Sequence, residues 1–303
     1  MYKKIVFTSN TTVSKLCLIL AMTIFSTIGI FRRYIPLSSG MLAAVRGIVG
    51  TIFLLLVFFS KKEKFHADTI KKNLFLLLLS GCFIGINWIF LFESYRYTTV
   101  ATATLCYYMA PIFVMLVSPF LFKEKMTIKK GLCIVSALIG MVFVSGILTE
   151  VPVNDMSQDS QLKGIVFGLL AAAFYASVIL LNKKISGVGA YEKTIFQLGS
   201  AAITILPYVL LTESFEAMNL TPNILVLIIF VGIVHTGIAY TLYFHSMGDL
   251  KAQTIALYSY IDPILAIILS AIILKEHMHP LAIIGAVLIL GAAMISEMPE
   301  SKK

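Results

Sequence analysis

The chain has 303 residues, of which 59% are hydrophobic and only 13% are charged, and its mean hydropathy is +0.94. Soluble globular proteins are usually about half apolar and about one-quarter charged, so this composition excludes that class. The formal net charge is +9, but the basic residues lie at the ends of apolar runs and form no solvated basic face. This distribution excludes a nucleic-acid-binding surface and predicts an all-α integral membrane protein.

Ten apolar runs follow one another, each close to the ~20 residues that a helix needs to cross about 30 Å of hydrocarbon. They lie near residues 13–31, 39–60, 73–93, 99–122, 127–147, 162–181, 192–211, 223–245, 252–274 and 279–296. The first run follows Lys3, Lys4 and Lys15 but ends at Arg32 and Arg33 without a small-residue cleavage pattern. We therefore expect a retained first helix and ten transmembrane helices in all.

A polar interruption divides the chain into two halves. It covers residues 149–161, between the fifth and sixth runs, and we expect it to be an extracytoplasmic linker. The halves are then residues 13–148 and residues 162–298. Each half holds five predicted helices, an odd number, so the second half enters the membrane with the opposite orientation. The sequence predicts two inverted five-helix repeats.

The two halves share sequence around their fourth helices. Without gaps, residues 81–126 and residues 233–278 are identical at 13 of 46 positions. The identities include the pairs Tyr108 and Tyr260, Pro111 and Pro263, Lys123 and Lys275, and Glu124 and Glu276. Apolar composition alone would give far fewer matches, so we interpret the halves as copies of one unit.

This pattern resembles the EamA branch of the drug/metabolite transporter superfamily. The resemblance rests on two five-helix halves, on the prolines Pro111 and Pro263, and on the Lys-Glu pairs that close the fourth and ninth helices. It covers nearly the whole chain. It implies an inner-membrane carrier, expected to export small organic metabolites such as amino acids or amphipathic drugs by alternating access. It also implies a central cavity lined by the first four helices of each half.

Asp262 is the strongest candidate for a substrate-binding residue. It lies 11 residues from Lys251 and 13 from Lys275, which at ~1.5 Å per residue places it roughly 16–20 Å from either helix end. A carboxylate near the bilayer centre is costly and commonly functional, although a salt bridge that only fixes helix packing is the alternative. The neighbouring Pro263 frees a backbone carbonyl, whereas Pro111 breaks the equivalent helix without an acid.

Two further polar groups lie at membrane depth. His235 matches Asp262 in depth, so the two are expected to meet and to carry a proton or hold a cation. A hydrogen bond from His235 to a neighbouring helix is the alternative. Arg46 in the second helix either binds an anion or pairs with Asp262 or Glu93. Its counterpart in the seventh helix is Gln197, so both halves keep a polar group at this level.

Aromatic residues supply the remaining candidates. Trp88 continues a helical stripe of glycines in the third helix, Tyr108 lies in the fourth helix, and Tyr258 and Tyr260 lie in the ninth. Such stripes are commonly packing faces, but aromatic side chains also line sites for amphipathic solutes. We therefore assign substrate-binding roles to Asp262, His235, Arg46, Trp88, Tyr108, Tyr258, Tyr260 and Gln197.

The sequence lacks the motifs of catalysis and cofactor binding. It has no Gly-x-x-x-x-Gly-Lys-Ser/Thr run, so direct use of ATP is excluded, and we expect no catalytic residue, cofactor or metal. The four cysteines lie in apolar runs without disulfide or metal-ligand spacing. An intramembrane enzyme using Asp262 and His235, or a non-transporting scaffold, is the alternative to a carrier. The expected partners are a small-molecule substrate and the lipid bilayer, with no nucleic acid and with a homodimer left open.

The distribution of basic residues predicts the orientation. If the N-terminus is cytoplasmic, 18 of the 24 Lys and Arg residues fall on the cytoplasmic side, which places both termini there. Reporter fusions at residue 66 and at residue 156 are then expected to give opposite signals, cytoplasmic and extracytoplasmic. Matching signals from the two fusions would refute the inverted repeat.

Overall fold

A computed structural model describes residues 11–123, 126–145, 148, 157–212, 221–250 and 252–298. Within these ranges all regular structure is helical. The first half contains α1 (Thr11–Ser26), α2 (Ile28–Tyr34), α3 (Ser39–Ser60), α4 (Ala67–Tyr97), α5 (Val100–Tyr107), α6 (Ala110–Phe122) and α7 (Ile128–Val144). The second half contains α8 (Gln158–Lys184), α9 (Ala190–Thr212), α10 (Pro222–Phe230), the π-helix η2 (Val231–Ile238), α11 (Ala239–Asp249), α12 (Ala252–Ser259), α13 (Ile261–Ile273) and α14 (Pro280–Glu297).

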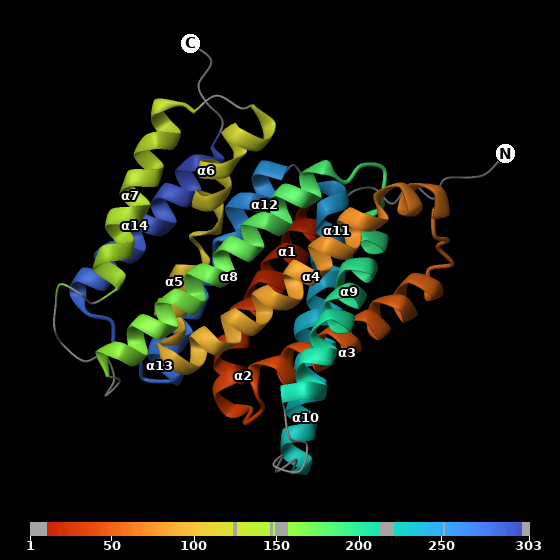
Figure 1. Cartoon of the computed structure of the whole chain (residues 1–303), viewed down its shortest axis with the longest axis horizontal. Coiled ribbons are helices and arrows are strands. Elements are labelled where there is room, and N and C mark those ends of the chain that lie inside the picture. The colour runs from red at the N-terminus through yellow and green to blue at the C-terminus, as the bar shows by residue number, and fades with distance from the viewer. Residues whose placement is uncertain are drawn as a thin grey trace.

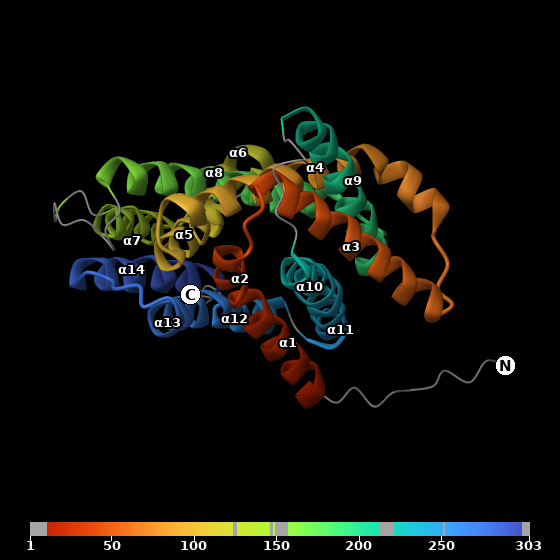
Figure 2. The ribbon, with the colours of Figure 1, turned by 90° about the horizontal axis from the view of Figure 1, so that it is seen from below.

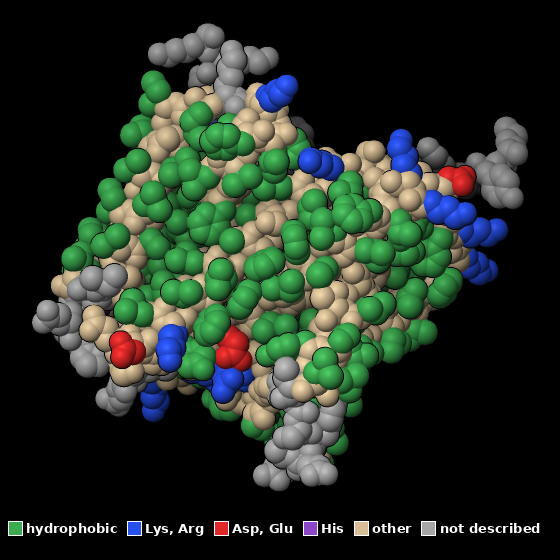
Figure 3. All heavy atoms as spheres, in the orientation of Figure 1, with side chains coloured by type: hydrophobic (Ala, Val, Ile, Leu, Met, Phe, Trp, Pro, Cys, Tyr) green, Lys and Arg blue, Asp and Glu red, His purple; other side chains and the backbone are tan. Residues whose placement is uncertain are grey.

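The helices have the length and surface of a multi-pass membrane protein. Seven stretches of the described residues are long and apolar enough to cross a membrane: Thr11–Tyr34, Ser39–Ser60, Ala67–Tyr97, Val100–Phe122, Gln158–Lys184, Ala190–Leu211 and Pro222–Tyr243. Shorter apolar helices follow at Ile261–Ile273 and Pro280–Ser296. Figure 3 shows a broad apolar band on one face, with Lys and Arg along its upper edge and both acidic and basic side chains along its lower edge. The count of ten crossings and the inverted repeat stay predictions.

The sixth predicted helix begins earlier than expected. Of the expected linker, residues 149–156 lie outside the described residues. Ser157 caps α8, because its side chain accepts a hydrogen bond from Ser160 N at 3.3 Å, and the helix starts at Gln158 and not near residue 162. Asp159 in the first turn suits the positive end of the helix dipole. Hydropathy marks where the apolar region begins, whereas the cap decides where the helix begins.

The helices pack in two layers, which Figure 2 shows edge-on. One layer contains α3, α4, α8 and α9, and α4 packs along both α8 and α9. The other contains α1, η2, α11, α12 and α13, with α1 packed along α11. The contact between α3 and η2 joins the layers. Each layer therefore combines helices from both halves of the chain.

The predicted fifth and tenth helices, α7 and α14, pack against each other at one end of the bundle (Figure 1). Their contact is close because each contributes a glycine. A Cβ at Gly140 would lie 2.7 Å from the carbonyl oxygen of Gly285, and a Cβ at Gly285 would lie 2.5 Å from that of Gly140. Small residues allow such close helix approach in membranes, where van der Waals packing replaces the hydrophobic effect.

We predict that Gly140→Ala and Gly285→Ala each lower stability, because overpacking typically costs about 1–3 kcal/mol. Gly131 in α7 and Gly291 in α14 are matched controls, since a Cβ at either meets nothing within 4 Å. Alanine there is expected to be neutral or to stabilise by up to ~1 kcal/mol through helix propensity. Thermal unfolding of the purified protein in detergent measures the difference, and equal midpoints for all four variants would contradict this packing.

Candidate functional site

Asp262 lies where two helix interruptions meet. The fourth predicted helix is interrupted between α5 and α6 at Tyr108, and the ninth between α12 and α13 at Tyr260. Pro111 and Pro263 occupy the first turn of the helix that follows each interruption, where the missing N–H of proline is tolerated. The interruptions leave backbone groups at membrane depth that need partners from within the protein.

Tyr108 connects the two interruptions. Its hydroxyl lies 3.2 Å from Ser259 O and 3.1 Å from Asp262 Oδ2, and it donates to these two acceptors. The carbonyl oxygen of Ser259, beside the interruption of the ninth helix, thereby accepts a hydrogen bond from the other half of the chain. Asp262 is partly exposed.

Arg46 is buried in α3 and is held by uncharged partners. Its Nε donates to Thr236 Oγ1 at 2.8 Å, and its Cζ lies 4.6 Å from the ring centre of Trp88. Thr236 belongs to η2, which approaches α3 closely at Gly50, because any Cβ at that position would collide with the Thr236 side chain. Arg46 is 5% exposed, and a charge this buried usually has a carboxylate partner.

Arg46 and Asp262 do not form an ion pair. Among the described residues, ion pairs join Arg33 to Glu276, His66 to Glu192 and Arg96 to Glu93, so the expected alternatives for Arg46 are not observed. The charges of Arg46 and Asp262 nevertheless lie within electrostatic range of each other, and Tyr95, Tyr107 and Tyr240 lie near Arg46. A cation and an anion held apart among tyrosines suit a solute that carries both charges.

His235 contacts the first predicted helix and makes no hydrogen bond with Asp262. It is 1% exposed, and its Nε2 lies 2.8 Å from Thr27 Oγ1, between α1 and α2. Because the Thr27 hydroxyl donates to Ile24 O at 2.8 Å, His235 Nε2–H is the donor to Thr27. His235 Nδ1 is buried and has no hydrogen-bond partner among the described residues. The structure thus has the helix-to-helix hydrogen bond, which was the alternative to an Asp262 pair.

Three other candidates lie in packing positions. Gln197 is 4% exposed, and its Nε2 donates to Ser80 Oγ at 2.7 Å and to Asn182 Oδ1 at 2.6 Å. It therefore joins α9 to α4 and α8. Tyr260 is buried in a cluster with residues of α5, α7 and α14, and Tyr258 packs beside residues of α1. Among the aromatic candidates, Trp88 and Tyr108 contact the two charged groups directly.

Two threonines of the site were not expected from the sequence. Thr236 accepts the hydrogen bond from Arg46, and Thr27 accepts the one from His235. Threonine hydroxyls in membrane helices commonly bond the backbone of their own helix, so a lone threonine carries little information. The one available signal is that Thr236 follows His235 directly in the sequence.

Known transporters match the chain over most of its length. The pattern of the EamA-like transporter family matches residues 13–146 and again residues 162–298. The uncharacterized transporter YxxF of Bacillus subtilis (strain 168) is 31% identical over 258 residues, 84% of this chain and 80% of the relative. A protein of Salmonella typhimurium (strain LT2), described as "Probable amino-acid metabolite efflux pump", is 26% identical over 262 residues, 82% of this chain and 84% of the relative. One crystal structure of a protein, at 17% identity, has a TM-score of 0.65 over 94% of this chain and 96% of its own, which shows a shared fold.

We predict that Tyr108→Phe destabilises the protein by about 1 kcal/mol, because it removes the donor that Ser259 O and Asp262 share at a partly buried position. Tyr34→Phe is the matched control, since Tyr34 is 56% exposed at the end of α2. Thermal unfolding in detergent compares the two. Equal unfolding midpoints for both variants would show that the hydroxyl does not connect the interruptions.

Proposed function

Because the chain belongs to the EamA-like transporter family, we propose that it is a secondary transporter that exports small organic metabolites across the plasma (inner) membrane by alternating access. The observation that carries the proposal is the arrangement of Arg46 and Asp262. Each lies within a membrane helix, and no ion pair joins them. Charged side chains within membrane helices commonly mark substrate and ion pathways.

The preferred solute is small, amphipathic and zwitterionic, and amino acids are the simplest members of this class. Arg46 suits a carboxylate, because its guanidinium can donate bidentate hydrogen bonds. Asp262 suits an ammonium group, and the rings of Trp88 and Tyr108 suit an apolar side chain. The description of the Salmonella typhimurium relative as an amino-acid metabolite efflux pump supports this choice.

The helix contacts support two inverted halves that move against each other. In an inverted repeat, the packing of α4 on α8 and of α1 on α11 would be equivalent contacts, third helix on sixth and eighth on first. Lys123 and Lys275, at matching positions, both end their helices with positive φ, 54° and 55°. Interrupted helices in both halves also fit carriers whose site lies between two repeats.

We place both ends of the chain in the cytoplasm. α1 begins and α14 ends on the side of the bundle where α8 ends and α4 begins (Figure 1). The end of α8 carries Lys183 and Lys184, and the start of α4 is followed by Lys71 and Lys72. Such clusters favour the cytoplasmic side.

An intramembrane enzyme receives less support than a carrier. A reaction using Asp262 and His235 would bring these two side chains together, whereas His235 is bonded to Thr27 and Asp262 to Tyr108. The YxxF and Salmonella typhimurium relatives are both described by a transport function. A scaffold without transport would not require two charges in the membrane interior.

We predict that Asp262→Asn lowers amino-acid flux in proteoliposomes by about tenfold or more, as expected when a charged hydrogen-bond partner is lost. Asp262→Glu is expected to keep part of the flux. Folding should be preserved, because alanine occupies the matching position 110 and no ion pair is broken. Asp68→Asn, an exposed acid in the first turn of α4, is the control and should transport normally.

Arg46→Gln tests recognition of the solute's carboxylate separately from recognition of its ammonium group. It should reduce flux of an amino acid strongly but leave flux of the corresponding decarboxylated amine much less affected. Full transport by well-expressed Asp262→Asn, or equal effects of Arg46→Gln on both solutes, would overturn the zwitterion site.

A further inference from the structure

The end of the first predicted helix, α2, is set off from α1 by a single residue that keeps right-handed helical backbone angles (φ −84°, ψ −11°). α1 stops at Ser26 and α2 begins at Ile28, with Thr27 between them. Thr27 is fixed by its contact with His235 at 2.8 Å. Beyond it, the ring of Phe31 lies 4.9 Å from the His235 ring and 5.2 Å from the Phe230 ring, centre to centre. α2 is thus a short helix that starts directly after Thr27, the residue that His235 holds.

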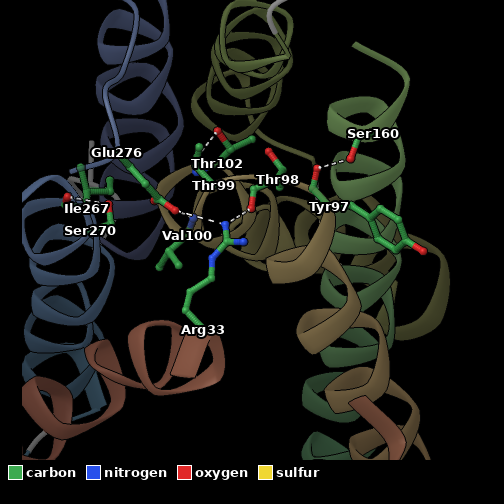
Figure 4. A network of polar contacts seen from close by, with 10 residues as sticks. All are labelled: Arg33, Tyr97, Thr98, Thr99, Val100, Thr102, Ser160, Ile267, Ser270 and Glu276. Atoms are coloured by element: carbon green, nitrogen blue, oxygen red, sulfur yellow. Dashed lines mark hydrogen bonds and ion pairs between the residues drawn. The ribbon is translucent and has the colours of Figure 1, made fainter. Parts of the chain in front are cut away.

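The far end of α2 is tied to two other helices by Arg33, as Figure 4 shows. Arg33 Nη2 donates to Thr98 O at 2.6 Å and to Glu276 Oε1 at 3.2 Å. Glu276 Oε2 accepts from Val100 N at 2.8 Å, at the start of α5. Arg33 and Glu276 form what we call the latch, and it joins the first, fourth and ninth predicted helices.

The backbone after α13 positions the latch carboxylate. Lys275 has a φ of 55°, which ends the helix and turns Glu276 back toward α5. The Glu276 side chain is 8% exposed and that of Arg33 is 24% exposed. Burial raises the pKa of Glu276, while Arg33 and the N–H groups at the start of α5 oppose this rise. Desolvation therefore offsets part of the attraction between Arg33 and Glu276.

α2 is held by contacts with α3 and α5 and borders a hollow beside its connection to α3. Arg32 fastens α2 to the start of α3, because its Nη1 donates to Ile35 O at 2.9 Å and its Nη2 to Ser39 Oγ at 3.3 Å. A polar hollow of about 600 Å³ lies beside this connection, lined by residues that include Ser38, Ser39, Glu93 and Arg96. On its other side, α2 closes tightly on α5, since a Cβ at Gly29 would lie 2.6 Å from Val100 Cγ1.

The face of α5 beneath α2 leads to the site. Val100, Thr104 and Tyr108 are spaced four residues apart, so they lie on one side of the helix. Tyr108 contacts Asp262. Moving α2 away from Val100 would therefore open a route toward the central carboxylate from the face opposite the lysine-rich loops.

We infer that α2 is the extracytoplasmic gate of the carrier, with its hinge at Thr27 and its latch at Arg33 and Glu276, and that the structure holds this gate closed. The inference rests on the proposed function, because a gate implies a transported solute. To the proposed function, the inference adds the moving element α2, the residues Arg33 and Glu276 that hold α2, and the extracytoplasmic side on which α2 acts.

Thiol labelling tests the latch without any substrate. The four native cysteines are replaced by alanine, and Thr104→Cys, at a position 4% exposed, serves as the reporter. A membrane-impermeant thiol reagent is added outside intact cells. We expect Glu276→Gln to raise the labelling rate about tenfold, the effect of losing a charge-assisted hydrogen bond. Glu93→Gln is the matched control, because Glu93 pairs with Arg96 within α4 at 2.9 Å, and it should not change the rate. Equal rates for Glu276→Gln and the unmodified latch would overturn the inference.

A reversible cross-link provides a second test that does not depend on the stability of Glu276→Gln. Gly29→Cys with Val100→Cys places the two new side chains in contact, because a Cβ at Gly29 would lie 2.6 Å from Val100 Cγ1. Oxidation should stop flux and reduction should restore it, whereas the single variants should be insensitive to oxidant. Unchanged flux through the cross-linked protein would show that α2 does not move. Absence of amino-acid flux in the unmodified protein would count against the proposed function alone, since the labelling test needs no flux.

Discussion

In hydrocarbon, a backbone polar group without a hydrogen-bond partner costs roughly several kcal/mol of free energy. This constraint organises the interior of the protein. The helices are interrupted at Thr27, at Tyr108 and at Tyr260, and the eight residues of η2 form a π-helix. These irregular segments lie together in two pairs. The Tyr108 hydroxyl donates to Ser259 O across the two halves, and the His235 side chain in η2 bonds the Thr27 side chain.

The polar side chains at one pair of equivalent positions have different partners in the two halves. Gln197 completes a buried network with Ser80 and Asn182 and stabilises the packing of α9. Its counterpart Arg46 has a threonine and an aromatic ring as partners, and no carboxylate pairs with it among the described residues. The two halves are alike in their helices and differ in the polar side chains at equivalent positions.

Adjacent residues of η2 contact Arg46 and the junction between α1 and α2. Thr236 accepts from Arg46, and His235 donates to Thr27 at the start of α2. A displacement of the Arg46 guanidinium would therefore act on the same π-helical segment that bonds Thr27. A π-helical segment at this point agrees with the frequent occurrence of such segments at functional sites.

The sequence by itself determined the membrane class, the family and the position of most apolar spans, because hydropathy and residue spacing act along one dimension. It did not determine which side chains meet. The spacing predicted that His235 and Asp262 meet, yet packing turns His235 toward Thr27 and Asp262 toward Tyr108. The role of Gln197, the Thr236 partner of Arg46 and the latch between Arg33 and Glu276 were likewise decided only in the tertiary structure. Contacts between helices depend on the rotation of each helix and on close approaches at residues such as Gly50, which no single-helix pattern specifies.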